Sequence, residues 1–324
     1  MNEKVKCGLI IGFLGKTKDR FHEYNEIKNL EEKLSLLTEI EDVDGVETVF
    51  PYEVNDADIF KNLIKKYNLN IAAINVNIKA EPEFRNGSIS SPDKKIREKA
   101  INIIKQSKDF AKEVGANKVT CCPLGDGYEF NFQYDYGTTW KYIVDSFSEA
   151  ADYVREVPLY IEYKPSETRG RCFIDTAAKA LCLLNDMKTA ETGVTVDFGH
   201  STYGNENPAE VVALLAQSPY KYYVHINDND GKWDWDYMVG TKHLLDYIEF
   251  IYYLQKYNYN DYLTSDTSPT RWDIKGTFEM NARMTNKIWN KLKSIDSNKL
   301  ENLITENNFL ETWKFIESEI LSFK

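Results

Sequence analysis

Short runs of apolar and β-branched residues recur along the chain, and each is followed by a longer stretch whose apolar residues return with helical spacing. This alternation is typical of repeated strand and helix units around a parallel sheet. Eight runs are found, the number of parallel strands that closes a (β/α)₈ TIM barrel. The expected strands are residues 7–14, 46–50, 70–76, 118–122, 159–163, 193–198, 222–226 and 262–265.

Helix signals lie between these runs. The clearest helix is expected to begin at Ser91, which can cap it, with Pro92 in its first turn, and to end near Gly115. A second helix is expected over residues 140–155, and a third begins at Asn207. We therefore expect the α/β class, with helices on the outside of the barrel.

The segment 278–324 is polar with spaced apolar residues, which predicts the last barrel helix and a helical tail. We expect one barrel domain over residues 1–285 and a C-terminal helical extension over 286–324. The aromatic residues of this tail fit two arrangements equally well. The tail packs on its own barrel, or it contacts a partner subunit in a homo-oligomer such as a dimer or tetramer.

The charge and hydropathy of the chain exclude some classes of binding partner. The chain of 324 residues is 42% hydrophobic, which is enough for a large core, and its formal net charge is -11. This charge would repel nucleic acid, so we expect no nucleic-acid partner. No apolar run approaches the roughly 20 residues that span a bilayer, so we expect a cytoplasmic protein with no membrane partner. A small neutral molecule or a cation is the expected ligand.

Polar residues stand at the ends of four successive apolar runs. Glu162 and Lys164 follow the fifth run, and Asp197, His225 and Asp266 mark the sixth, seventh and eighth. The C-terminal ends of barrel strands meet at one rim, so these side chains are expected to face one another. Carboxylates brought together in this way repel unless a cation lies among them. We expect a divalent ion, preferably Mn²⁺, with Mg²⁺, Co²⁺ and Zn²⁺ as alternatives.

A second set of ligands lies nearby. His200 comes three residues after Asp197, and the loop after the seventh run carries Asp234 and Asp236. With Asp197 as a bridge, these residues could hold a second ion, so one or two ions are expected. A single carboxylate at a strand end is more often a helix cap. However, two of the four histidines of the chain stand beside acidic residues on adjacent strands, which favours metal binding.

Other residues are candidates for contacting a substrate. Lys164 could polarise a substrate carbonyl or form an ion pair with Glu162. The segment from Asp126 to Gln133 offers glycines, aromatic residues and amides suited to a polyol, although it could be a structural loop. Glu53 is either an additional acid or base or a helix-capping carboxylate. His200 is a candidate for substrate contact as well as for metal binding.

These motifs resemble the xylose-isomerase-like TIM barrel superfamily of sugar isomerases and epimerases, most closely the L-rhamnose isomerase and xylose isomerase branch. The resemblance covers roughly residues 46–266 and rests on the segments IEYKP (161–165), VDFGH (196–200) and WDWD (233–236). It implies an aldose–ketose isomerase that acts on a free monosaccharide and moves hydrogen between C1 and C2, with metal as Lewis acid and template.

The resemblance also implies the roles of residues. Lys164 would contact a substrate oxygen. Two departures bear on the substrate and on opening of the sugar ring. Glu53 and its neighbours stand where the xylose enzymes place a histidine, and the fourth strand ends without their tryptophan. The implied first metal set is Glu162, Asp197, His225 and Asp266, and the second is Asp197, His200, Asp234 and Asp236.

Alternatives from other classes remain open. A ketose 3-epimerase of the same superfamily would use Glu162 and Asp266 as its acid–base pair, although Asp266 is shorter than the expected Glu. The Asp234 and Asp236 pair favours the two-metal isomerase. A zinc endonuclease on this fold would need more histidines and a basic groove. A barrel that binds sugar without catalysis is a further alternative.

Overall fold

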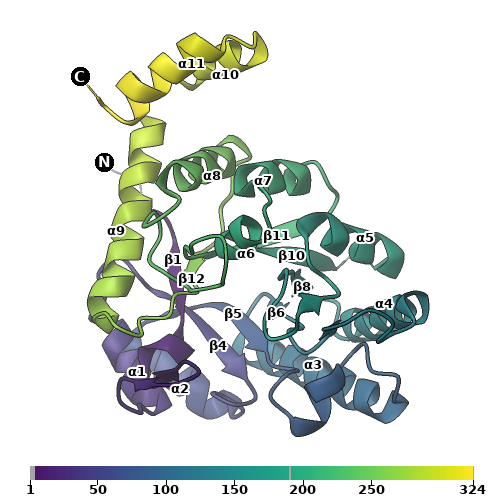
Figure 1. Ribbon diagram of the computed structural model, residues 1–324. Helices are drawn as coiled ribbons and strands as arrows, with labels where there is room; N and C mark the ends of the chain where they lie inside the picture. Colours follow the sequence, from purple (N-terminus) through teal and green to yellow (C-terminus); the bar gives the residue numbers. More distant parts are fainter. Residues whose placement is uncertain (1–3, 190, 324) are drawn as a thin grey trace.

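The computed structural model describes residues 4–189 and 191–323 and shows a closed barrel of eight parallel strands surrounded by helices (Figure 1). The predicted (β/α)₈ barrel is confirmed. Around the barrel the order is β1-β12-β11-β10-β8-β6-β5-β4, and the ring closes between β1 and β4. The strands are β1 (Cys7–Ile10), β4 (Gly45–Phe50), β5 (Asn70–Val76), β6 (Val119–Cys121), β8 (Leu159–Glu162), β10 (Thr192–Asp197), β11 (Lys221–Ile226) and β12 (Leu263–Ser265).

The helices cover the outside of the barrel, and its loops form two short antiparallel sheets of two strands each. One pairs β2 (Thr17–Lys18) with β3 (Glu23–Tyr24), and the other pairs β7 (Gly127–Tyr128) with β9 (Arg171–Cys172) from a different loop. The helices are α1 (Leu30–Leu37), α2 (Ala57–Tyr67), α3 (Lys94–Val114), α4 (Tyr136–Asp152), α5 (Ala177–Met187), α6 (Phe198–Tyr203), α7 (Pro208–Ala216), α8 (Leu244–Lys256) and α9 (Ile274–Lys293), with short 3₁₀ turns η1 (Ile11–Leu14) and η2 (Pro82–Asn86).

Several strands and helices begin or end at other residues than expected, because local hydrogen bonds determine where they start and stop. The first strand stops at Ile10, because the backbone tightens into η1 where we expected strand to residue 14. Asp93 caps α3 through the backbone N–H of Lys95, so the expectation that Ser91 caps it was wrong. Asp135 caps α4, which therefore begins at Tyr136. Capping side chains fix these ends because they satisfy backbone N–H groups that the helix leaves unpaired.

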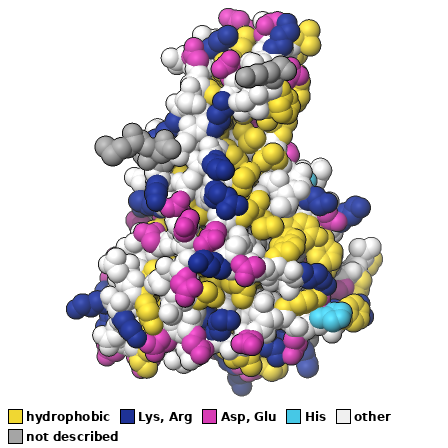
Figure 2. Space-filling model, turned by 90° about the vertical axis from the view of Figure 1, so that its left-hand side faces the viewer, with side chains coloured by type: hydrophobic (Ala, Val, Ile, Leu, Met, Phe, Trp, Pro, Cys, Tyr) yellow, Lys and Arg dark blue, Asp and Glu magenta, His cyan; other side chains and the backbone are white. Residues whose placement is uncertain are grey.

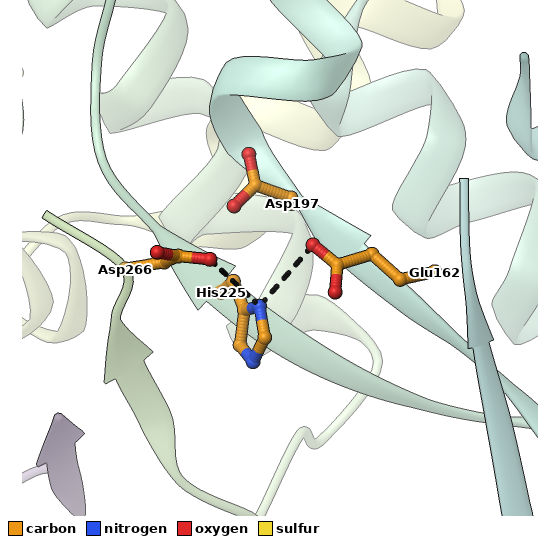
Figure 3. A group of neighbouring side chains, drawn as sticks. All are labelled: Glu162, Asp197, His225 and Asp266. Carbon is orange, nitrogen blue, oxygen red and sulfur yellow. Dashed lines mark hydrogen bonds and ion pairs between the residues drawn. The ribbon is translucent and has the colours of Figure 1, made fainter. Parts of the chain in front are cut away.

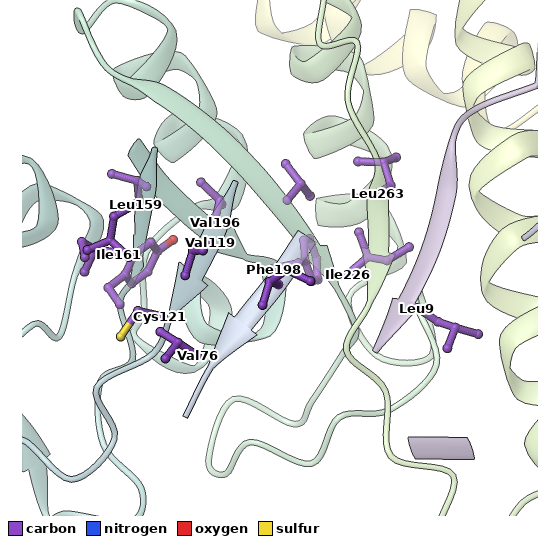
Figure 4. Close-up of a cluster of buried hydrophobic side chains, with 14 of the residues drawn as sticks. Leu9, Val76, Val119, Cys121, Leu159, Ile161, Val196, Phe198, Ile226 and Leu263 are labelled. Carbon is purple, nitrogen blue, oxygen red and sulfur yellow. The ribbon is translucent and has the colours of Figure 1, made fainter. Parts of the chain in front are cut away.

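Strand alternation divides the barrel residues into two groups. Leu159, Ile161 and Val196 belong to the large apolar core that the strands share with the helices (Figure 4). Residues one position along each strand face the opposite side, since successive side chains alternate. There Tyr160 and Tyr223 form a separate buried cluster. The apolar core therefore lies between barrel and helices, while the interior is left for aromatic filling and polar groups.

The C-terminal part is helical, as predicted, and stands out from the barrel (Figure 1). It consists of α10 (Ser297–Thr305), α11 (Phe309–Phe315) and the π-helical turn η3 (Ile316–Ile320). The expected domain boundary at residue 285 falls inside α9. Hydrophobic side chains gather between this extension and the body below it (Figure 2). Its division from the barrel and its contact with a second subunit stay predictions.

The described helices include none that is both long enough and apolar enough to cross a membrane. This finding agrees with the hydropathy of the sequence. The cytoplasmic location stays a prediction.

We predict that Gly193→Ala lowers the free energy of unfolding by about 1–3 kcal/mol, because overpacking a filled interior has costs of this size. A Cβ at Gly193 would lie 2.6 Å from Cε1 of Tyr160 and 2.7 Å from the Lys221 carbonyl oxygen. Urea unfolding measures the change. Gly137→Ala is the control, since its Cβ would meet nothing closer than 3.6 Å in helix α4. Equal stability of the two variants would contradict the proposed packing.

Candidate metal centre and active site

Four of the predicted ligands meet at the C-terminal rim of the barrel (Figure 3). Glu162 ends β8, Asp197 ends β10, His225 lies near the end of β11, and Asp266 directly follows β12. One ligand atom from each of these four lies within 4.8 Å of those of the other three. The barrel thus assembles a candidate divalent-metal site from residues spread over a hundred positions of sequence.

The orientation of His225 shows which nitrogen faces the cluster. Its Nε2 lies 3.0 Å from Oε2 of Glu47. A carboxylate only accepts hydrogen bonds, so Nε2 carries the proton, and Nδ1 points to Glu162 at 3.4 Å and Asp266 at 3.6 Å (Figure 3). Burial lowers the pKa of His225, but Glu47 and Glu162 outweigh burial and raise it well above the usual value. Nδ1 therefore faces its two carboxylates either with a proton of its own or with a bound cation in place of that proton. Histidines that bind a metal through one ring nitrogen commonly donate a hydrogen bond from the other to a carboxylate, which fixes the orientation of the ring.

Glu47 is a functional residue that the sequence reading missed. It lies in the middle of β4, is fully buried, and accepts hydrogen bonds from Thr120 Oγ1 at 2.8 Å and Tyr223 OH at 3.1 Å. The search for polar residues at strand ends passed over it. A charged residue within a buried strand is itself a signal, because such residues are almost never fully buried without a partner.

The charges of the cluster shift one another's pKa values. Burial raises the pKa of Asp266 to about 7, with Asp197 and Glu162 adding to the rise against the effect of His225. Burial also raises the pKa of Glu162, but His225, His200 and Lys79 outweigh it, and the net shift is downward. This pattern is what like charges crowded in a water-poor site produce.

Residues of the second set lie beside the first. His200 Nε2 lies 3.1 Å from Oδ2 of Asp234, and the Lys164 ammonium forms an ion pair with the same oxygen at 2.8 Å. Burial, Asp234 and Asp266 raise the pKa of Asp236 well above its usual value. Asp228 holds their loop by accepting from the backbone N–H of Lys242 at 2.7 Å and of His243 at 3.0 Å.

Two buried atoms of this second set have no hydrogen-bond partner among the described residues, Nδ1 of His200 and Oδ1 of Asp234. Buried polar atoms without partners are uncommon and call for an explanation. Both belong to residue types that ligate divalent ions, and Nδ1 of His200 lies 3.3 Å from Oε1 of Glu162. The donor types therefore fit a second cation next to the first, while the group of described residues whose ligand atoms all lie within 4.8 Å of one another is the first set.

Two of the residues expected to contact a substrate have hydrogen-bond partners within the protein. Asp126 is buried and accepts from the backbone N–H groups of Ser88 and Ser90, both at 2.8 Å, as well as from their hydroxyls. Gln133 pairs with Glu129 within its own loop. Asp126 is thus paired with residues of the segment 88–90 and Gln133 with a residue of its own loop, and contact of either side chain with a substrate stays a prediction.

Glu53 is likewise a structural carboxylate. It accepts from Lys33 Nζ at 2.8 Å and from the backbone N–H of Val49 at 3.2 Å. It is not among the residues that line the cavity at the rim. Helix α2 is capped by Asp56, so the structure places Glu53 as an ion-pair partner of Lys33 and not as a helix cap.

The cavity at the rim has a volume of about 220 Å³ and is lined by Glu162, His200, Asp234, Asp236 and Asp266. Lys164 lines it as well, together with residues from the opposite side of the barrel. This volume is below the roughly 300–1,000 Å³ of pockets for drug-sized ligands. It suits one small polar molecule.

We predict that Glu47→Gln lowers Mn²⁺ affinity by roughly 10- to 100-fold, the usual effect of removing a group that orients a ligand. Titration calorimetry on metal-stripped protein measures the affinity. Glu53→Gln is the matched control, since Glu53 lies six residues further on, outside the cavity. The control should bind Mn²⁺ like the unaltered protein, and equal losses in both variants would contradict the role of Glu47.

Comparisons with known proteins agree with the barrel fold. The xylose isomerase of Thermus thermophilus is 23% identical over 191 residues, which cover 57% of this chain and 49% of that protein. The chain thus aligns with about half the length of this relative. The structure of L-ribulose 3-epimerase matches with a TM-score of 0.71 and 17% identity, covering 89% of this chain and 96% of that one.

A structure of the IOLI protein with a bound zinc atom has a TM-score of 0.68 and 16% identity, covering 90% of this chain and 100% of that one. Below 25% identity, these two structural matches establish the fold alone. The family model described as "Xylose isomerase-like TIM barrel" matches residues 36–286, well over half of the sequence. The chain belongs to the xylose isomerase-like TIM barrel family.

Proposed function

We propose that this protein is a divalent-metal-dependent aldose–ketose isomerase that acts on a free monosaccharide and moves hydrogen between C1 and C2. The observation that carries the proposal is that members of both ligand sets line one small cavity, with a buried lysine beside them. They are Glu162 and Asp266 of the first set and His200, Asp234 and Asp236 of the second. A site that only exchanges protons with one carbon would need only the first set. The name of the Thermus relative, xylose isomerase, points the same way.

The two sets share Asp197. Its Oδ1 accepts from the backbone N–H of His200 at 2.8 Å, and its Oδ2 accepts from Asn227 Nδ2 at 3.0 Å. These bonds fix the carboxylate between the first set and His200. When bound, divalent cations would polarise the oxygens at C1 and C2 of the open sugar and act as a Lewis acid and template.

Lys164 supplies a fixed positive charge next to the reacting end of the sugar. It is buried and pairs with Asp234 at 2.8 Å and Glu167 at 3.1 Å. Burial lowers its pKa, but Asp234 and Glu167 outweigh burial and raise it well above the usual value, so the side chain stays charged. A preorganised ammonium of this kind stabilises negative charge that develops on a substrate oxygen.

A ketose 3-epimerase is the second candidate. Glu162 and Asp266 approach Nδ1 of His225 from two directions (Figure 3). Two carboxylates so placed could exchange protons with opposite faces of one carbon. The matched L-ribulose 3-epimerase carries such an activity in its name. Asp234 separates the two candidates, since the epimerase has no role for it.

We predict that Mn²⁺-loaded protein interconverts at least one aldose–ketose pair and incorporates little deuterium when the reaction runs in D₂O. Direct hydrogen transfer between C1 and C2 does not exchange with solvent. NMR of a panel of free aldoses and ketoses measures conversion and deuterium at C2 and C3. Removing metal with a chelator should lower the rate by roughly 100-fold or more, and added Mn²⁺ should restore it.

Paired variants distinguish the candidates. Asp234→Asn should lower isomerisation by roughly 100-fold, because the second set loses a charged ligand. If ketose epimers appear with deuterium at C3, and Asp234→Asn retains that activity while Asp266→Asn loses it, the protein is an epimerase. If sugars bind but none reacts with any metal, the barrel only binds sugar.

A further inference from the structure

Two lysines line the cavity, and they differ in their partners. Lys164 is held by Asp234 and Glu167. Lys79 is exposed, lines the same cavity, and its ammonium has no ion pair or hydrogen bond within residues 4–189 and 191–323. The sequence reading assigned the substrate-facing cation to Lys164 alone. The structure leaves Lys79 as the lysine whose three N–H donors are available to a ligand.

The chain holds Lys79 at the rim through a short polar turn. Strand β5 ends at Val76, and Oδ1 of Asn77 accepts from the backbone N–H of Lys79 at 2.9 Å and of Ala80 at 3.0 Å. Ile78 between them is fully buried and anchors the turn in the core. The side chain of Asn77 thus sets where Lys79 leaves the strand, and both residues line the cavity.

In the ring, β5 lies two places from β8, which carries Glu162, and on the side away from β11, which carries His225. In the closed order of eight strands, β5 lies four places from β11, on the opposite side of the barrel. The candidate ligands come from β8, β10, β11 and β12 and their loops. A sugar held at C1 and C2 by these ligands would extend across the cavity toward Asn75, Asn77 and Lys79.

The chemistry of this wall favours neutral hydroxyls. It combines one ammonium with two side-chain amides that are each partly engaged. Nδ2 of Asn75 donates to Glu47 Oε1 at 3.2 Å, which leaves its Oδ1 to accept, and Oδ1 of Asn77 holds the turn, which leaves its Nδ2 to donate. No arginine is among the residues that line the described cavity, so this wall lacks the bidentate pairing that arginine gives carboxylates and phosphates. A single lysine beside two amides suits the oxygens of a polyol better than a phosphate group.

We propose that Lys79, placed by Asn77, is a specificity-determining residue that binds the hydroxyls of a neutral sugar at the end remote from C1 and C2. This inference rests on the proposed function of the same cavity. It predicts that the role of Lys79 depends on how long the sugar is. A short sugar held only by the metal ligands would not reach this wall.

The test uses the full chain loaded with Mn²⁺ and a series of ketoses with six, five and four carbons. Lys79→Met should lower kcat/KM for the six-carbon ketose by about 10- to 100-fold, the range for hydrogen bonds to a charged group, mainly through KM. The four-carbon ketose should change less than about threefold. Lys79→Arg should recover part of the loss, and Lys65→Met, an exposed lysine on α2, serves as control.

A loss that is equal for all chain lengths, or no loss, would overturn the assignment. So would a wild-type preference for uronic acids or sugar phosphates that Lys79→Met abolishes, because the ammonium would then bind an anion. If no sugar is converted, the proposed function fails, and calorimetry with a hexitol and a tetritol still tests Lys79. Hexitol binding that weakens in Lys79→Met while tetritol binding does not supports the inference, and absence of polyol binding overturns it.

Discussion

The site depends on the repulsion among carboxylates that the barrel holds too close together to be stable alone. Glu162, Asp197 and Asp266 converge from three strands within a few ångströms of one histidine nitrogen. Burial and mutual repulsion raise the pKa values of Asp197 and Asp266 even against the neighbouring histidines. The strands cannot move apart without opening the ring. The arrangement therefore selects for positive charge at its centre.

Other features of the interior follow from this requirement. Glu47 turns Nδ1 of His225 toward the cluster, and Thr120 and Tyr223 in turn hold Glu47. Lys164 and His200 lie against Asp234 and offset its negative charge. The hydrophobic core lies outside the ring, between strands and helices, so polar groups inside do not disturb the packing that provides stability.

The fold and the four residues of the central cluster could be predicted from the sequence because both follow from simple periodicities. Apolar runs mark the strands, and in a parallel barrel the residue at each strand end is placed by the strand itself. Residues in loops could not be placed in this way. Asp126 and Gln133 looked suited to a polyol, yet Asp126 accepts hydrogen bonds from the distant Ser88 and Gln133 pairs with Glu129 in its own loop. The partners that a loop carboxylate or amide finds depend on tertiary contacts.

Glu47 and Lys79 were missed for different reasons. Glu47 lies within a strand, where a search at strand ends does not look, although its charge amid apolar residues was a usable signal. Nothing in the sequence marks Lys79, since one lysine among 40 basic residues has no local pattern. Its significance arises from two facts of the fold, its place across the ring from β11 and the lack of a partner in the described structure.

The central claim is that two adjacent cations belong among these residues, and an anomalous-scattering map of crystals grown with Mn²⁺ tests it most directly. The account predicts one peak enclosed by Glu162, Asp197, His225 and Asp266. It predicts a second peak next to it, between Asp197, His200, Asp234 and Asp236. A single peak in the first set would contradict the two-cation account, and no peak among these residues at saturating Mn²⁺ would contradict metal binding at this rim altogether.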